Sequence, residues 1–100
     1  MKKIVLLCAA GMSTSMLVQK MNIAAEKEGY ECDIHAYSIA ELDSVKDNAD
    51  IILLGPQIRF KLNSVKEACK GVVVEAINPV DYGTMNGENV LAHVRKVVGD

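Results

Sequence analysis

The sequence predicts an α/β protein with a single open sheet of about four parallel strands and helices on both faces. Short apolar runs alternate with helical patterns along the whole chain, without a repeat or a linker. Several of these runs are continuously aliphatic, as in strands buried on both faces of a parallel sheet. Right-handed crossovers between parallel strands place helices on both sides of the sheet. We therefore expect one domain over residues 1–100.

The composition excludes several broad classes of protein. Half of the 100 residues are apolar and 24% are charged, which is enough for a hydrophobic core and argues against disorder. The formal net charge is −2 without a basic cluster, so nucleic acid is not the expected partner. The longest apolar run, Ile4 to Met12, is far shorter than the ~20 residues of a membrane span. We expect a soluble, cytoplasmic protein without direct membrane insertion.

The first third of the chain predicts two strands around one helix. Residues 3–8 form an apolar run that suits a buried strand, and residues 13–28 follow with helical spacing. Gly29 is suited to end this helix. Residues 32–37 alternate apolar and polar side chains, which indicates an edge strand with one solvated face. The apolar stripe of the helix comprises Leu17, Met21, Ala24 and Ala25.

The middle of the chain predicts a short helix, a buried strand and an amphipathic helix. Ser38 and Glu41 have the spacing of a capping box, so a short helix is expected to follow Ser38. Residues 51–54 form the third apolar run. Apolar side chains at helical spacing then predict a helix over residues 58–69, closed by Gly71.

The remainder predicts a strand, a loop and a final helix. Residues 72–77 form the fourth strand, and residues 78–83 are rich in turn-forming residues. A last helix is expected from Asn86, with Met85 and Val90 placed as a hydrophobic staple. Because ligands bind beyond the carboxyl ends of such strands, function is expected in three loops: residues 8–15, 55–57 and 78–84.

The chain has three widely spaced cysteines and no CxxC pair, so a zinc site or a redox dithiol is not expected. Cys69 falls on the apolar stripe of its helix, and Cys32 is at the amino end of its strand, so both are expected to be packing residues. With only four aromatic residues and no phosphate-binding GxxxxGK[ST] loop, we expect neither a metal nor a cofactor.

Cys8 is the candidate catalytic residue. It ends the first strand, and a short loop with small side chains leads from it directly into a helix. Backbone amides of such a loop and a helix N-terminus form an anion site, which also favours a thiolate. A thiolate beside donors for charged oxygens is suited to carry a phosphoryl group. The candidate phosphate site comprises Ala9, Ala10, Gly11, Met12, Ser13, Thr14 and Ser15.

Thiolate phosphatases share part of this pattern. Their C-x5-R-S/T loop uses an arginine to stabilise the transition state, whereas this chain has Thr14 at that position, followed by Ser15. Without the arginine, a phosphocysteine is expected to persist until another acceptor takes the group. A low-molecular-weight thiol phosphatase or an arsenate-reductase-like enzyme remains the alternative, with Arg59 near the same end of the sheet.

Three segments resemble one family. Residues 4–18, which include Cys8 and its loop, residues 49–58 and residues 80–83 are similar to the enzyme IIB component of the lactose/cellobiose (chitobiose) family of the bacterial phosphoenolpyruvate-dependent sugar phosphotransferase system. The resemblance implies a flavodoxin-like sheet, which low-molecular-weight phosphatases also have. It implies that Cys8 takes a phosphoryl group from a histidine of a IIA protein. The group then passes to a β-linked disaccharide such as cellobiose, chitobiose or lactose, held by a membrane IIC permease.

Four further residues are candidates for a supporting role or for contact with a partner. Gln57 follows the third strand, and Met16 lies just beyond the cysteine loop. Asp81 and Tyr82 lie in the loop after the fourth strand, where small phosphatases carry a general acid.

Overall fold

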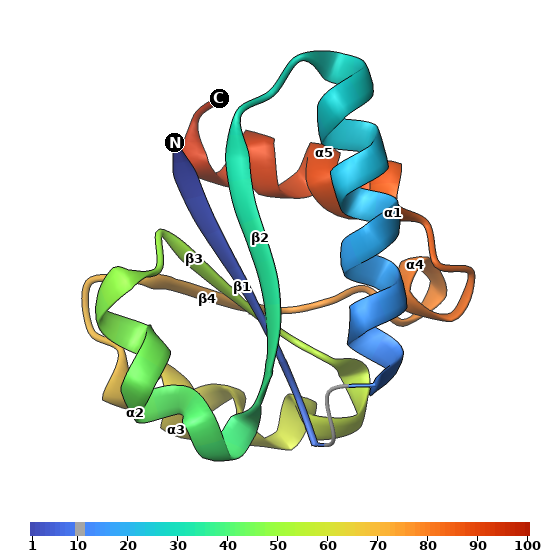
Figure 1. Ribbon diagram of the computed structural model, residues 1–100. Coiled ribbons are helices and arrows are strands. Elements are labelled where there is room, and N and C mark those ends of the chain that lie inside the picture. Colours follow the sequence, from blue (N-terminus) through green and yellow to red (C-terminus); the bar gives the residue numbers. More distant parts are fainter. Residues whose placement is uncertain (10–11) are drawn as a thin grey trace.

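In the computed structural model the four strands form one parallel sheet (Figure 1). The structure describes residues 1–9 and 12–100, except for the side chains of Met12 and Ser13. The strands are β1 (Lys2–Cys8), β2 (Cys32–Ser38), β3 (Ile51–Leu54) and β4 (Val73–Ala76), in the order β2-β1-β3-β4. This is the flavodoxin-type order: the chain adds β2 on one side of β1 and then β3 and β4 on the other side, so the switch point lies between β1 and β3. The predicted fold class is confirmed.

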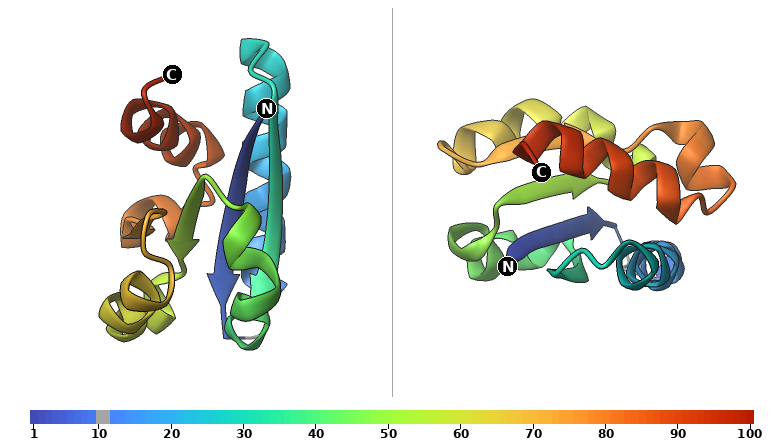
Figure 2. Two further views of the ribbon diagram at one scale, coloured as in Figure 1. Left: turned by 90° about the vertical axis from the view of Figure 1, so that its left-hand side faces the viewer. Right: turned by 90° about the horizontal axis from the view of Figure 1, so that it is seen from above.

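Helices cover both faces of the sheet (Figures 1 and 2). One core cluster packs α1 and α5 against one face, and a second packs η3 and α3, with part of α2, against the other. The helices are α1 (Met12–Glu28), α2 (Leu42–Val45), α3 (Leu62–Ala68), α4 (Pro79–Gly83) and α5 (Gly87–Val98). The 3-10 segments are η1 (Ile39–Glu41), η2 (Lys46–Asn48) and η3 (Pro56–Lys61). No helix of the described residues is long and apolar enough to cross a membrane.

Strand β1 shows why the apolar runs predicted the sheet correctly. Ile4 and Leu6 point into the cluster with α1 and α5, whereas Val5 and Leu7 point into the opposite cluster. Because successive side chains of a strand alternate between faces, a central strand covered on both sides must be apolar throughout. The alternating strand β2 is an edge strand, as expected.

The predicted ends and caps of several helices are also confirmed. Gly29 follows α1 with a φ of 65°, a left-handed conformation that glycine adopts at little cost. The side chain of Ser38 accepts from the amide of Ala40, and the Ser38–Glu41 capping box is present. Asn86 caps α5 by accepting from the amide of Asn89.

Two predicted elements differ from the structure. The helix expected over residues 58–69 is instead the 3-10 segment η3 followed by α3, which begins only after its N-cap Lys61, with φ −92° and ψ 3°. A further break lies inside η3, at Ile58, whose φ of −117° interrupts the helical backbone. Cys69 follows α3 as its C-cap. The expected loop over residues 78–83 contains α4, whose N-cap is Asn78, with Pro79 as its first residue. Asparagine at the N-cap followed by proline is a helix-start signal, and the turn-rich composition of this segment obscured it.

Helices α1 and α5 approach each other closely at Gly87. A Cβ added there would lie 2.4 Å from the backbone carbon of Lys20 and 2.6 Å from the amide nitrogen of Met21. No side chain fits in this space, so the first residue of α5 must be glycine for the two helices to pack as they do.

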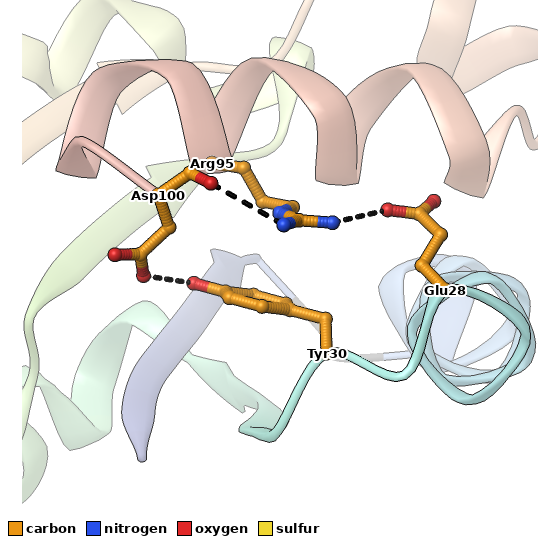
Figure 3. A network of polar contacts seen from close by, with 4 residues as sticks. All are labelled: Glu28, Tyr30, Arg95 and Asp100. Atoms are coloured by element: carbon orange, nitrogen blue, oxygen red, sulfur yellow. Dashed lines mark hydrogen bonds and ion pairs between the residues drawn. The ribbon is translucent and has the colours of Figure 1, made fainter.

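A polar network fastens the end of α5 to the segment between α1 and β2 (Figure 3). The hydroxyl of Tyr30 donates to a carboxylate oxygen of Asp100 at 2.6 Å. Arg95 donates to Glu28 at 2.8 Å, and its guanidinium lies 4.4 Å from the centre of the Tyr30 ring. Tyr30 lies two residues before β2 begins, so the network is at the amino ends of the strands, opposite the carboxyl end of β1 where Cys8 lies.

Candidate functional site

Cys8 is the last residue of the central strand β1, at the carboxyl edge of the sheet. It pairs with Ser38 at the end of β2, and the residue before it, Leu7, pairs with Leu54 at the end of β3. Cys8 therefore lies where the strand order reverses, which is the expected ligand position in this type of sheet. Its side chain is buried, with 4% exposed.

Thr14 contacts the sulfur directly. Its hydroxyl oxygen lies 3.1 Å from Sγ of Cys8 and donates a hydrogen bond to it. The Thr14 side chain is fully buried in the first turn of α1, a helix of 17 residues. A hydroxyl donor and the positive end of a helix dipole both stabilise negative charge on the sulfur or on a group bound to it. Thr14 occupies the position at which thiolate phosphatases have arginine, and here it is a buried residue that donates a hydrogen bond to the sulfur of Cys8.

The predicted phosphate loop is described in part. Ala9 is exposed, and its carbonyl accepts from the hydroxyl of Ser38 at 3.5 Å. Ala10 and Gly11 lie outside the described residues. Met12 and Ser13 begin α1, but their side chains are not described. Ser15 is exposed on the first turn of α1.

Gly55 brings the side chain of Gln57 close to the cysteine. A Cβ added to Gly55 would lie 3.1 Å from the side-chain oxygen of Gln57 and 3.5 Å from Cβ of Cys8. The amide of Gly55 donates to the carbonyl of Leu7 at 2.8 Å, which holds the start of η3 against the end of β1. Gln57 and Cys8 therefore both lie next to Gly55, and the supporting role of Gln57 stays a prediction. Glycine has no side-chain chemistry that would indicate this role, so the sequence predicts Gly55 only as part of the loop over residues 55–57.

The other candidate residues are separated by the fold. Met16 is 55% exposed on α1, so it is available to a partner. Tyr82 is only 7% exposed and packs in the core cluster between the sheet and α5, which leaves little of its surface for a partner; its supporting role stays a prediction. Its spacing from the fourth strand indicated a loop, whereas the helix α4 turns it inward.

Asp81 faces a cavity at the edge of the sheet. Its carboxylate accepts from the side-chain amide of Asn89 at 3.2 Å. The cavity measures about 340 Å³ and lies between β4 and α5, where Glu75 and His93 contact each other at 2.5 Å. Asp81 is thus engaged with α5 rather than placed against the sulfur by any described contact.

The other two thiols lie in unreactive surroundings. Cys69 is 4% exposed in the core cluster beneath α3, and burial raises the pKa of its thiol. Burial, followed by the charge of Asp33, likewise raises the pKa of Cys32. Because the thiolate is the nucleophile, both environments disfavour reaction. The prediction that Cys69 is a core residue is confirmed.

Comparison with known proteins places the chain in a family. The family model for the lactose/cellobiose-specific IIB subunit of the PTS system matches residues 3–93. The chain belongs to this family. The resemblance seen in the sequence is thereby confirmed, and the matched range includes Cys8, Thr14, Gly55 and Gln57.

Individual relatives carry the same designation. The galactose-specific EIIB component of Lactococcus lactis subsp. cremoris is 44% identical to this IIB chain, over 91% of each sequence. The cellobiose-specific EIIB component of Lactococcus lactis subsp. lactis is also 44% identical, with the same coverage. A solution structure of the cellobiose-specific IIB component of Borrelia burgdorferi is 42% identical, with a TM-score of 0.82 over 98% of this chain and 92% of that one. A YwlE mutant from Bacillus subtilis, 14% identical with a TM-score of 0.59, covers 100% of both chains and shares the fold.

Proposed function

We propose that this IIB chain is a phosphocarrier in sugar uptake, with Cys8 as the residue that carries the phosphoryl group. The observation that supports this most strongly is the environment of the Cys8 sulfur. It lies at the switch point of the sheet, at the N-terminus of α1, and accepts a hydrogen bond from a buried threonine. Membership of a phosphotransferase subunit family supplies the class of reaction.

In the first step the Cys8 thiolate attacks the phosphorus of a phosphohistidine on a IIA protein. The sulfur–phosphorus bond forms as the phosphorus–nitrogen bond breaks, and the imidazole nitrogen keeps the electron pair and takes up a proton. In the second step a sugar hydroxyl held by the membrane IIC permease attacks the same phosphorus. The sulfur–phosphorus bond breaks, the hydroxyl loses its proton, and Cys8 returns to the thiolate.

This IIB chain supplies positioning and charge stabilisation for both steps. The helix N-terminus, together with Thr14, stabilises the charge that develops around the sulfur. The backbone amides of residues 9–15 and the hydroxyls of Ser13 and Ser15 are assigned to the phosphoryl oxygens. The side-chain amide of Gln57, beside Gly55 and Cys8, is available as a further donor.

The sugar is assigned to the class of β-linked disaccharides such as cellobiose, chitobiose or lactose. Relatives that are equally similar to this chain are named for galactose and for cellobiose. Overall identity therefore does not distinguish the sugars, which fits selection by the IIC permease rather than by the IIB chain.

The test is to incubate the chain with a phosphorylated IIA protein of the lactose/cellobiose type and to record phosphorus NMR spectra. We expect a phosphocysteine signal that is absent from Cys8→Ala, while Cys69→Ala keeps it. Mass spectrometry after digestion locates the group, and a phosphate on His35, His93 or Cys32 would refute the assignment. Rapid release of inorganic phosphate, with hydrolysis of an aryl phosphate, would instead support the thiol phosphatase alternative.

A further inference from the structure

The segment η3 presents an exposed aromatic side chain at the same edge of the sheet as Cys8. Phe60 is 77% exposed, although phenylalanine is one of the most frequently buried residue types. The segment begins just after β3, and the hydrogen bond from Gly55 to Leu7 holds it against the end of β1. Figures 1 and 2 show η3 beside the lower end of β1.

The exposure of Phe60 is imposed by a rigid support. Its neighbour Ile58 is 4% exposed in the core cluster beneath η3, and its amide donates to the carbonyl of Gly55 at 3.0 Å. Leu62, at the start of α3, packs against the same cluster. Because Ile58 and Leu62 are anchored inward, the segment between them is held outward. Phe60 is therefore already in a fixed position before a partner binds, which lowers the entropy cost of docking.

The charges on either side of Phe60 indicate what covers it. Arg59 and Lys61 are exposed, and neither forms an ion pair with a carboxylate of the described residues. Lys61 extends over the ring, with Nζ 6.0 Å from its centre. Between Asp50 and Glu67 the chain carries three basic residues and no acidic one, although its net charge is −2. The aromatic side chain is therefore flanked in the sequence by positive charges on a protein that is negative overall.

From these observations we infer that Phe60, Arg59 and Lys61 form the docking site for the phosphodonor, a IIA-type protein whose contact face has an apolar pocket bordered by carboxylates. The inference rests on the proposed function, because a donor must cover the Cys8 edge to reach the sulfur. Aromatic and arginine side chains at the centre of an interface contribute a large share of its affinity. The two cations attract a donor that still carries its negative phosphoryl group, which raises the association rate.

The apolar part is tested by isothermal titration of the chain with an unphosphorylated IIA protein of the lactose/cellobiose type. We expect Phe60→Ala to raise the dissociation constant about tenfold or more, as for an interface hot spot. Ile23→Ala is the matched control, because Ile23 is also an exposed apolar residue, at 60%, but lies farther along α1. We expect it to change the constant less than about twofold, as for a residue outside the contact.

The charged part is tested by the salt dependence of the same titration. Arg59→Gln combined with Lys61→Gln is expected to weaken binding at low salt and to flatten its dependence on salt. The control is Lys3→Gln combined with Lys70→Gln, which makes the same change in net charge near the amino ends of the strands. It is expected to keep the wild-type salt dependence.

The outcomes separate this inference from the proposed function. Wild-type affinity in Phe60→Ala, or the absence of binding by the wild-type chain, overturns the docking site. Because Phe60 is exposed, the variant is expected to keep its fold, and an amide NMR spectrum verifies this. Binding that depends on Phe60 without any transfer of phosphate to Cys8 would leave the docking site in place and refute the phosphocarrier. If Phe60→Ala still accepts the phosphoryl group on Cys8 at the donor concentration that the wild type requires, the docking site is refuted and the phosphocarrier stands.

Discussion

Replacing Thr14 by valine tests how far its hydroxyl prepares Cys8 for reaction. Valine keeps nearly the same shape, so the core around this fully buried side chain is retained while the 3.1 Å hydrogen bond to Sγ is lost. A hydrogen bond to a charged group contributes about 1.5–3 kcal/mol. Each 1.4 kcal/mol is a factor of ten, so negative charge on the sulfur is expected to be stabilised roughly ten- to hundredfold less.

The measured rate of reaction at Cys8 is expected to fall by less than this loss of charge stabilisation. A thiolate that is less stabilised is intrinsically more nucleophilic, with a Brønsted coefficient of about 0.4–0.5, which offsets nearly half of the loss on a logarithmic scale. We therefore expect alkylation of Cys8 by iodoacetamide at neutral pH to slow about three- to fifteenfold. The rate is followed by mass spectrometry of the peptide that contains Cys8, so that the other two cysteines do not contribute.

Thr14→Ser is the matched control, because it retains the hydroxyl and removes only the methyl group. It is expected to react at nearly the wild-type rate, with some loss of stability from the small cavity. Urea unfolding of both variants separates stability from reactivity. The reasoning fails if Thr14→Val reacts as fast as the wild type while folded, or if the serine variant is as slow as the valine variant.

Three further predictions concern stability and the remaining thiols. Gly87→Ala is expected to lower the free energy of unfolding by about 1–3 kcal/mol, as overpacking does, because the new Cβ would lie 2.4 Å from the backbone of α1. The control in urea unfolding is Gly83→Ala, which should be near neutral because nothing lies within 4 Å of the added Cβ. Cys69→Ala is expected to cost on the order of 1 kcal/mol and to leave phosphoryl transfer to Cys8 unchanged, and a loss of transfer at full stability would show that the thiol takes part. Burial, followed by the hydrogen bond to Asp100, raises the pKa of Tyr30 above its usual 10.0. The neutral hydroxyl of Tyr30 therefore stabilises the folded protein fully below pH 10, and this contribution is lost as the pH rises further. Tyr30→Phe should therefore show a smaller loss of stability than the wild type between about pH 9 and pH 12, and an equal loss in both proteins would contradict this.

Local patterns were sufficient for most of the secondary structure and for the position of Cys8 at the end of a strand and the start of a helix. The aliphatic runs of β1 and β3 predict strands that are covered on both faces, because polar side chains on either face would be buried without partners. The capping box at Ser38 and the glycine after α1 are likewise readable from spacing, since they depend on residues within one turn. A cysteine followed by small residues and a helix start places a thiol at a helix N-terminus, whatever surrounds it.

Contacts between distant segments required the tertiary structure. The aim of the Thr14 hydroxyl depends on how α1 packs against the end of β1, and the position of Gln57 depends on the pairing of β3 with that strand. The backbone break at Ile58 within η3 has the same origin: its side chain turns into the core, and the chain that follows is held outward with Phe60 exposed. Tyr82 lies in the core for a corresponding reason, since α4 turns it toward α5. Each of these features depends on which surfaces of distant segments pack together and on the backbone geometry that this packing requires. Periodicity within a single segment carries no information about such packing.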